Sequence, residues 1–350
     1  MMHIKHWLRA WPSVAMALSM AALAGVSLVG QASSSKPTGP KKAPFPVALH
    51  AGAAAEDYLG EKTCGGCHPA YMESYEASPH AQYVRDPKLP GDHRGCESCH
   101  GPGKNHLEHQ EEGEIQKYIF APSKSSAADV NASCLRCHSR TMSEAHWKKS
   151  SHARGDISCI SCHFIHKDAK QADPAARATR DAQSIRKPTA VAVKETQHLL
   201  KDHEADLCAS CHKADVAQFR QPYHHPVPEG RMTCSDCHEP HPTRTSLRKG
   251  SMRVGLKNPT QVCATCHREV AGPFVYQHDP VTGASGDGCI ECHKPHGATN
   301  PKMLGAFSRG LCNQCHTDKN ATHYPGQTCW ASGCHAALHG SNSDPNLLVR

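Results

Sequence analysis

All 20 cysteines of this chain lie in ten close pairs, and each pair is followed immediately by a histidine. Composition alone would produce roughly 0.1 Cys-x-x-Cys-His motifs in this chain, and nine are present. The nine are Cys64/Cys67/His68, Cys96/Cys99/His100, Cys134/Cys137/His138, Cys159/Cys162/His163, Cys208/Cys211/His212, Cys234/Cys237/His238, Cys263/Cys266/His267, Cys289/Cys292/His293 and Cys312/Cys315/His316. The tenth motif, Cys329/Cys334/His335, has four residues between its cysteines instead of two.

Cys-x-x-Cys-His is the attachment sequence of c-type haem. Its two thiols add across the two vinyl groups of the porphyrin, and the adjacent histidine reaches the iron from one face. The ten motifs therefore predict ten covalently bound haem c groups, with the histidine of each motif as the proximal ligand. In the tenth motif the longer loop must bulge to hold both thioethers.

Three other uses of cysteine were weighed against haem. Structural zinc uses Cys-x-x-Cys pairs with four ligands to each metal, but it does not require a histidine after every second cysteine. A disulfide framework suits an exported chain with an even number of cysteines, yet it leaves ten placed histidines unexplained. A thioredoxin-like dithiol is a single motif rather than ten.

The other histidines follow the spacing of the motifs. Along the chain the motifs form five successive pairs, and in every pair a histidine of the repeat lies between the two motifs and another follows the second. These ten histidines predict a second, distal ligand for every iron. They are His80, His152, His224, His278 and His323 between motifs, and His106, His166, His241, His296 and His339 after them.

Two of these positions have a neighbouring histidine as an alternative. In the first three pairs an aromatic residue stands five positions before the histidine that lies between the motifs, and this register favours His224 over His225. His106 is favoured over His109 because it follows the turn after the second motif more closely. Both alternatives stay open on the sequence alone.

His166, His241 and His296 stand three residues after a proximal histidine, too close to reach the far face of the same haem. We therefore expect each of them to ligate a neighbouring haem. The remaining histidines outside the repeat are interpreted as surface residues: His93, His146, His198 and His203. Methionine is the competing axial ligand, but the methionines outside the leader show no repeat register. Those considered are Met72, Met142, Met232, Met252 and Met303.

The elements that must position these motifs are short. Pro and Gly turns separate helical stretches such as 69–77 and 144–150, and long Val/Ile alternations are missing, so few strands are expected. With only four Trp, eight Tyr and six Phe in 350 residues, a large protein-only core is not expected. The predicted fold is a multihaem cytochrome c of short helices and loops wrapped around a chain of haems, and the haem-free chain should not fold.

The first residues resemble a secretory signal. Lys5 and Arg9 form a basic region, an apolar run of small residues follows from 14 to 29, and Ala32 ends a small-residue cleavage site. A membrane anchor is the alternative, but this run is shorter than the roughly 20 residues that span a bilayer. We expect a signal peptide at 1–32, a flexible segment at 33–55, and an exported mature chain.

The formal charge of +7 would suggest an anionic partner such as nucleic acid, but it does not include the haems. Each haem with two histidines and two ionised propionates adds about −1 when ferric and about −2 when ferrous, so ten haems reverse the sign. Nucleic acid is therefore not an expected partner.

The motifs together resemble those of the decahaem cytochromes of porin–cytochrome electron conduits, the MtrA, DmsE and PioA family. The resemblance rests on ten motifs in about 290 residues, on Cys-His-Gly-Pro-Gly at 99–103, on Cys-His-x-Pro-His at 237–241 and 292–296, and on the run 332–342. It implies an elongated chain of two tandem pentahaem halves, 56–215 and 216–350, the first including the polar linker 167–206.

The resemblance also implies a place and partners. The chain would lie in the periplasm, associated with the outer membrane. It would accept electrons from a periplasmic or inner-membrane cytochrome and meet an outer-membrane β-barrel porin and an extracellular cytochrome or mineral. With two histidines on each iron the expected function is electron transfer, not catalysis. A multihaem reductase with one open haem site, or a soluble donor to a terminal reductase, is the alternative.

Overall fold

The computed structural model describes residues 46–111, 117–142, 144–166, 184–186, 199–241, 259–320, 328–330 and 333–349, with only the backbone described at 144–146 and 320. All of them belong to one contact unit, Ala43–Arg350, which is separate from Met1–Lys42. The predicted signal peptide and His323 lie outside the described residues. Most of the segments 33–55 and 167–206 also lie outside the described residues.

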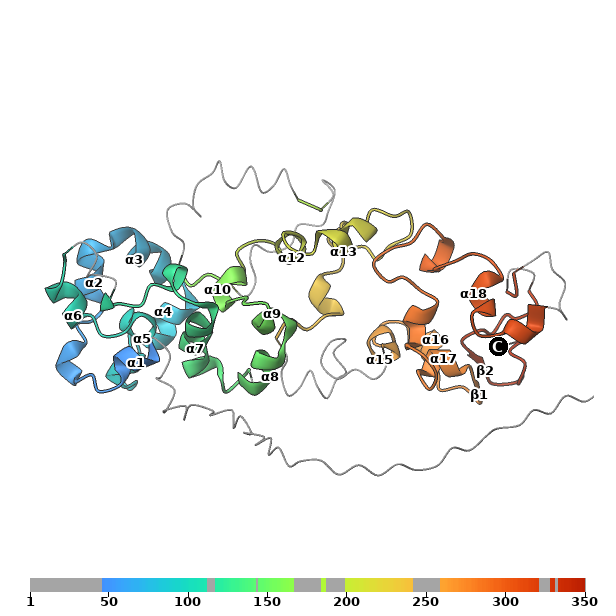
Figure 1. Ribbon diagram of the computed structural model, residues 1–350, viewed down its shortest axis with the longest axis horizontal. Helices are drawn as coiled ribbons and strands as arrows, with labels where there is room; N and C mark the ends of the chain where they lie inside the picture. The colour runs from blue at the N-terminus through green and yellow to red at the C-terminus, as the bar shows by residue number, and fades with distance from the viewer. Residues whose placement is uncertain are drawn as a thin grey trace, which may run out of the picture. The chain divides into compact units, whose positions relative to one another are not determined.

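Short helices make up most of the regular structure (Figure 1). The α-helices are α1 (Val47–His50), α2 (Glu61–Cys67), α3 (Pro69–Glu76), α4 (Pro79–Val84), α5 (Glu97–His100), α6 (Lys104–Glu108), α7 (Ala127–His138), α8 (Glu144–Lys149), α9 (Ser151–Arg154), α10 (Cys159–Cys162), α12 (Glu204–Ala209), α13 (Lys213–Gln218), α15 (Thr260–Cys263), α16 (Arg268–Ala271), α17 (Asp279–Thr282) and α18 (Gly310–Asn313). The 3-10 helices are η1 (Ala55–Asp57), η2 (Gly91–His93), η4 (Pro122–Lys124), η6 (Cys234–Asp236), η7 (Gly288–Glu291), η8 (Pro301–Met303) and η9 (Thr317–Asn320).

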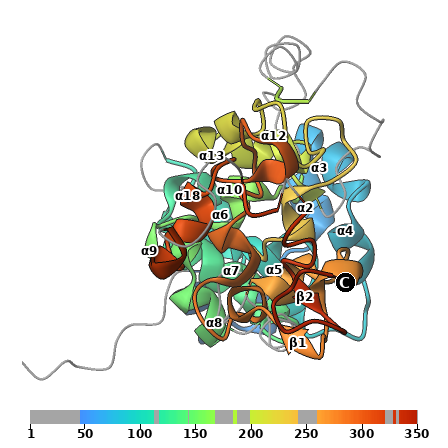
Figure 2. The ribbon, with the colours of Figure 1, turned by 90° about the vertical axis from the view of Figure 1, so that its right-hand side faces the viewer.

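The only strands in the described ranges are two residues long. β1 (Tyr276–Gln277) pairs antiparallel with β2 (Gly340–Ser341), and the two lie side by side in both views (Figures 1 and 2). The expectation of short helices with little strand is confirmed, and α3 and α8 fall within the stretches 69–77 and 144–150.

Each of the nine regular motifs forms one helical turn. In the first motif the backbone N–H of His68 donates to the carbonyl oxygen of Cys64 at 2.9 Å, and the same bond recurs in the other regular motifs whose turn lies at a helix end. Residues three apart on a helix lie on the same face, so this turn brings the two thiols of a motif together and sets the histidine beside them. In the tenth motif the backbone N–H of His335 donates to the carbonyl oxygen of Cys329 at 3.1 Å, and this hydrogen bond spans the longer loop.

Local sequence signals fix where several helices begin. The Ser126 hydroxyl caps α7 by accepting from the N–H of Asp129 at 3.1 Å, and Ser150 caps α9 in the same way. Ser78 caps α4, where Pro79 supplies the fixed φ that suits the first helical position. These caps let very short helices begin at defined residues.

Few apolar side chains are buried in the described residues. They are Tyr75, Ala81, Val84, Phe120, Val130, Leu135, Trp147, Ala205, Val227, Ala298, Leu304 and Ala337. Tyr75, Ala81 and Val84 form a small cluster on α3 and α4. Such a set is small for a chain of this length, which agrees with the expectation that side chains alone do not fill the interior. Among the described helices none has the length and apolar character needed to cross a bilayer.

Candidate haem-binding sites

The first cysteines of the two motifs in a pair lie in contact. Cys64 and Cys96 are in hydrogen-bonding contact through their thiols. The same contact joins Cys134 to Cys159, Cys208 to Cys234, Cys263 to Cys289 and Cys312 to Cys329. The structure therefore groups the motifs into the five pairs that the sequence spacing indicates.

The second cysteines face the other way, toward the neighbouring pair. Cys99 interacts electrostatically with Cys137, which belongs to the first motif of the next pair. The same relation links Cys162 to Cys211, Cys237 to Cys266 and Cys292 to Cys315. Within a pair the two first cysteines interact, and between neighbouring pairs two second cysteines interact. These two kinds of interaction alternate from the first motif to the tenth.

Cys334, the second cysteine of the tenth motif, differs from its counterparts in the other pairs. The second cysteines of the other four second motifs are half-buried, whereas Cys334 is exposed. The sequence predicts the same attachment for all ten motifs and does not anticipate this difference. Thioether attachment at Cys334 stays a prediction.

Polar side chains join the two motifs within a pair. Asn131, on α7 three residues before Cys134, accepts from the backbone N–H of Cys159 at 2.8 Å. Glu204 of α12 accepts from the N–H and hydroxyl of Ser235 at 2.6 and 2.9 Å. In the fourth pair the Cys289 thiol lies 3.4 Å from the Thr260 hydroxyl. Each of these residues precedes the first motif of its pair, so the helix that carries one motif also positions the next.

Eight motif histidines each lie opposite a histidine from another part of the chain, with ring centroids 5.6–6.3 Å apart. The pairs are His100–His166, His138–His80, His163–His241, His212–His152, His238–His296, His267–His225, His293–His339 and His316–His278.

This separation is what ligation of one iron requires. Two imidazoles bonded to opposite sides of one metal ion, with metal–nitrogen bonds of about 2 Å, place their ring centroids about 6.2 Å apart. Within the described residues the histidines meet in twos, and no group of three His, Cys, Asp or Glu residues is placed to hold one ion. The donor set therefore fits a metal that already has four in-plane ligands, as a haem iron has.

The eight pairs follow one rule when the motifs are numbered from the N-terminus. The first motif of a pair meets the histidine that lies between the motifs of the preceding pair. The second motif meets the histidine that follows the next pair. Neighbouring pairs therefore exchange histidines, as His80 with His138 and His166 with His100 show. The expectation for His166, His241 and His296, that each reaches a neighbouring motif, agrees with their positions.

At the third pair the geometry differs from the sequence preference for His224. The Nδ1 atom of His224 lies 2.5 Å from the carbonyl oxygen of Gln221, and its Nε2 atom lies 3.3 Å from Glu229. Both of its nitrogens are therefore occupied. His225 instead uses Nδ1 on the Pro295 carbonyl at 2.6 Å and turns its ring toward His267. The register of the preceding aromatic residue does not report which ring nitrogens are satisfied, so these contacts favour His225 where the register favours His224.

At the first pair the structure favours His106 over His109. His109 stacks on Tyr118 with ring centroids 4.4 Å apart. His106 and His68 both lie close enough to act on His100: burial lowers the pKa of His100 most, and these two histidines lower it further. His106 thus lies in the same neighbourhood as the first motif.

Backbone carbonyls orient several of these rings. The Nδ1 atoms of His100, His278 and His293 lie 2.6–2.8 Å from the carbonyl oxygens of Phe120, Leu338 and Lys302. A ring that donates from Nδ1 keeps the lone pair of Nε2 for a metal. Burial also lowers the pKa of His241, to about 4, which keeps its imidazole neutral as ligation requires.

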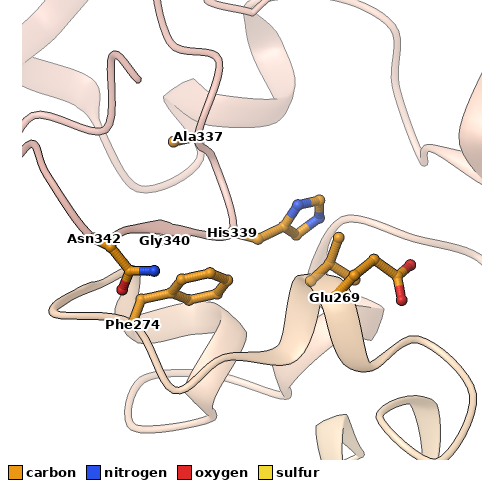
Figure 3. A pocket seen from close by; sticks show the side chains of 7 residues that line it. Glu269, Phe274, Ala337, His339, Gly340 and Asn342 are labelled. Carbon is orange, nitrogen blue, oxygen red and sulfur yellow. The ribbon is translucent and has the colours of Figure 1, made fainter. Parts of the chain in front are cut away.

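Aromatic rings beside the histidines that follow each pair were not identified as functional on the sequence. Tyr71 packs edge-on against His166 at 5.0 Å, Trp147 lies 6.3 Å from His241, and Phe219 lies 5.2 Å from His296. Near the C-terminus Phe274 and Val270 line a pocket with His339, and Figure 3 shows the Phe274 ring beside that histidine.

Two glycines directly follow the predicted distal histidines His296 and His339, and the sequence did not indicate that they have a role either. A Cβ atom on Gly297 would lie 2.1 Å from the carbonyl oxygen of Gln218, and one on Gly340 would lie 2.3 Å from the Phe274 ring. The dipeptide His-Gly at 296–297 and 339–340 is the sequence signal that marks both close approaches.

The histidines predicted to lie outside the repeat have other surroundings where they are described. His93 pairs with Asp92 at 2.8 Å, and His203 stands at the start of α12. The side chain of His146 and all of His198 lie outside the described residues.

Comparisons with known proteins agree with this arrangement. Residues 224–272 and 278–321 match the family described as doubled CXXCH motif, and residues 96–180 match the family of cytochrome c-type proteins like NrfB. The multiheme cytochrome MtrA of Shewanella baltica (strain OS185) is 29% identical over 273 residues, which are 73% of this chain and 70% of that protein.

The motifs, their paired histidines and these matches define a multihaem c-type cytochrome, a protein that carries electrons on covalently bound haem. Within this class the chain is similar to the multiheme cytochrome MtrA.

Proposed function

We propose that the chain binds ten haem c groups and relays electrons along them from one end of the motif series to the other. The observation that carries this proposal is the exchange of histidines between neighbouring pairs, which gives eight irons two imidazole ligands each. The alternating contacts between first and second cysteines support it further. They place the cysteines that would carry the thioethers of successive haems near one another from the first motif to the tenth.

The ligands of the two end haems complete the set. The first motif has no preceding pair to supply a histidine, and the tenth has no following pair. Two predicted ligands remain, His106 in the first pair and His323 in the last, and we assign them to the motifs of His68 and His335. The third pair supplies His225 in place of His224. The series then divides into pentahaem halves at 56–215 and 216–350.

Irons that have imidazole ligands at both axial positions favour electron transfer over catalysis. A reductase needs an iron with an open or exchangeable position for its substrate. The proposed set leaves every iron with two imidazoles, whose neutral form and orientation are supported by burial and carbonyl contacts. Ten such haems are suited to passing electrons onward.

We further propose that the chain works in the periplasm as part of an outer-membrane conduit. The relationship to MtrA and the leader-like residues 1–32 support this location. The partners would be an outer-membrane porin, an extracellular cytochrome or mineral on one side, and a periplasmic or inner-membrane cytochrome on the other.

The test combines mass and spin state of the purified holoprotein. Electrospray mass spectrometry should show ten haems on the mature chain, and electron paramagnetic resonance of the oxidised protein should show low-spin ferric haem throughout. Markedly fewer haems would contradict the relay. A high-spin signal equal to one haem would favour the reductase instead. Co-purification with a porin in detergent, with electron transfer to an acceptor outside proteoliposomes, tests the conduit separately.

A further inference from the structure

The first haem site differs from the interior sites in the source of its distal histidine. Interior motifs meet a histidine from a neighbouring pair, whereas the proposed ligand of the first motif, His106, comes from its own pair. His106 lies on the five-residue helix α6, on which Asn105, Leu107 and Glu108 are exposed. Helices this short have little intrinsic stability, so α6 needs tertiary contacts to hold its histidine in place.

One buried carboxylate supplies such a contact. The side chain of Glu97, in the second motif, belongs to a residue only 3% exposed and accepts three backbone N–H bonds of 2.8 Å each. The donors are Leu59 and Gly60, directly before α2, and Gly103, directly before α6. Charged acceptors with several N–H donors form strong hydrogen bonds, and the low dielectric of a buried site strengthens them.

These three donors belong to the two segments that the first haem must span. Gly60 stands at the start of α2, which carries Cys64 and Cys67, the covalent attachment points. Gly103 stands at the start of α6, three residues before His106. A single carboxylate therefore fixes the separation between the helix that holds the porphyrin and the helix that bears the proposed distal ligand.

In the sequence, the residue directly after the first cysteine of the second motif is a carboxylate only in the first pair of motifs. In the others it is Ile160, Ser235, Ile290 and Trp330. In the interior sites a neighbouring pair supplies the distal histidine, so the exchange of histidines itself joins the two segments. In the first site the distal histidine comes from the same pair of motifs, and Glu97 joins the segments that begin α2 and α6.

We propose that Glu97 is a positioning residue that holds His106 on the iron of the first haem. This inference rests on the proposed assignment of His106 as the ligand opposite His68. Without the carboxylate α6 loses the three hydrogen bonds that tie it to α2, and the ion pair of Lys104 with Asp57 at 3.6 Å is too weak to replace them. The axial position of the first iron then becomes open to an external ligand such as carbon monoxide.

The test uses the holoprotein with Glu97→Ala and Glu97→Gln. Alanine removes both acceptor oxygens and with them all three hydrogen bonds. Glutamine keeps the size of the side chain but sets an amide N–H₂ group against one of the N–H donors, so its effect should be smaller. Ferrous Glu97→Ala should bind carbon monoxide at about one haem in ten, and its ferric form should gain a high-spin signal of the same size. Glu97→Gln should show a fraction of that signal.

Two further variants separate the possible failures. Glu204→Gln is the matched control, because Glu204 also accepts a backbone hydrogen bond between two motifs, but from Ser235 inside a motif and not from the start of a helix that bears a distal histidine. This variant should bind no carbon monoxide. His106→Ala should open one haem. If His106→Ala opens none, the ligand assignment is wrong. If His106→Ala opens one haem but Glu97→Ala opens none while both keep their full haem content, the role of Glu97 is wrong.

Discussion

A single methyl group at Gly297 should open the sixth haem. Gly297 follows His296, the proposed distal ligand of the motif that ends at His238, and its α-carbon approaches the last residue of α13. A Cβ atom there would lie 2.1 Å from the carbonyl oxygen of Gln218. The backbone fixes the position of a Cβ atom, and the carbonyl oxygen is itself a backbone atom, so neither can rotate away and the two segments must separate.

The displacement follows from these distances. Real Cβ contacts are essentially never shorter than 3.0 Å, so the Gly297→Ala variant must move the two segments apart by about 0.9 Å. An iron–nitrogen bond of about 2 Å does not stretch by that amount. Because Gly297 is bonded directly to His296, the shift falls on the imidazole, and overpacking of this kind also costs about 1–3 kcal/mol of stability.

The assay is carbon monoxide binding to the reduced holoprotein, with spin state in the oxidised form. Gly297→Ala should bind carbon monoxide at about one haem in ten while keeping its full haem content, and His296→Ala should give the same spectrum. Gly91→Ala is the control, because a Cβ there meets neighbours only at 3.8 Å or more. A Gly297→Ala protein with all haems low-spin and no carbon monoxide binding would refute the assignment of His296 to this site.

Three further predictions concern stability. Asn131→Ala leaves the N–H of Cys159 without its acceptor, so the holoprotein should lose about 1–3 kcal/mol in denaturant unfolding, whereas alanine at the exposed Asn105 should cost much less. Burial, reinforced by the nearby guanidinium of Arg136, lowers the pKa of His50 from 6.5 to about 4. Between these values the unfolded chain binds a proton that the folded chain excludes, so stability falls as the pH is lowered through this window. His50→Gln removes this part of the pH dependence, and equal slopes for both proteins in urea unfolding would contradict it. The haem-free chain, expressed without haem attachment, should show no cooperative unfolding by circular dichroism, and a folded far-UV spectrum would contradict the proposal that porphyrins fill the interior.

Sequence spacing alone located the covalent chemistry. Two thiols three residues apart and an adjacent histidine form one helical turn wherever they occur, so each regular motif could be identified without knowledge of its surroundings. The repeat of the motifs also indicated the five pairs, which the contacts between first cysteines reproduce. The scarcity of aromatic residues indicated short helices around a non-protein core, and the buried side chains agree with this. How deeply each thiol lies was not indicated, as the exposed Cys334 shows.

The choice of distal histidine needed the tertiary structure. A histidine meets its partner motif across a neighbouring pair, so nothing in its local sequence specifies which motif that is. Whether a ring nitrogen is free to bind iron also depends on how the chain folds around it, as the carbonyl oxygen of Pro295 shows for His225. The carboxylate of Glu97 and the close approach at Gly297 are likewise meetings of separate segments. Covalent attachment is a local property that the sequence determines, whereas axial ligation joins two segments and is decided by how the chain packs.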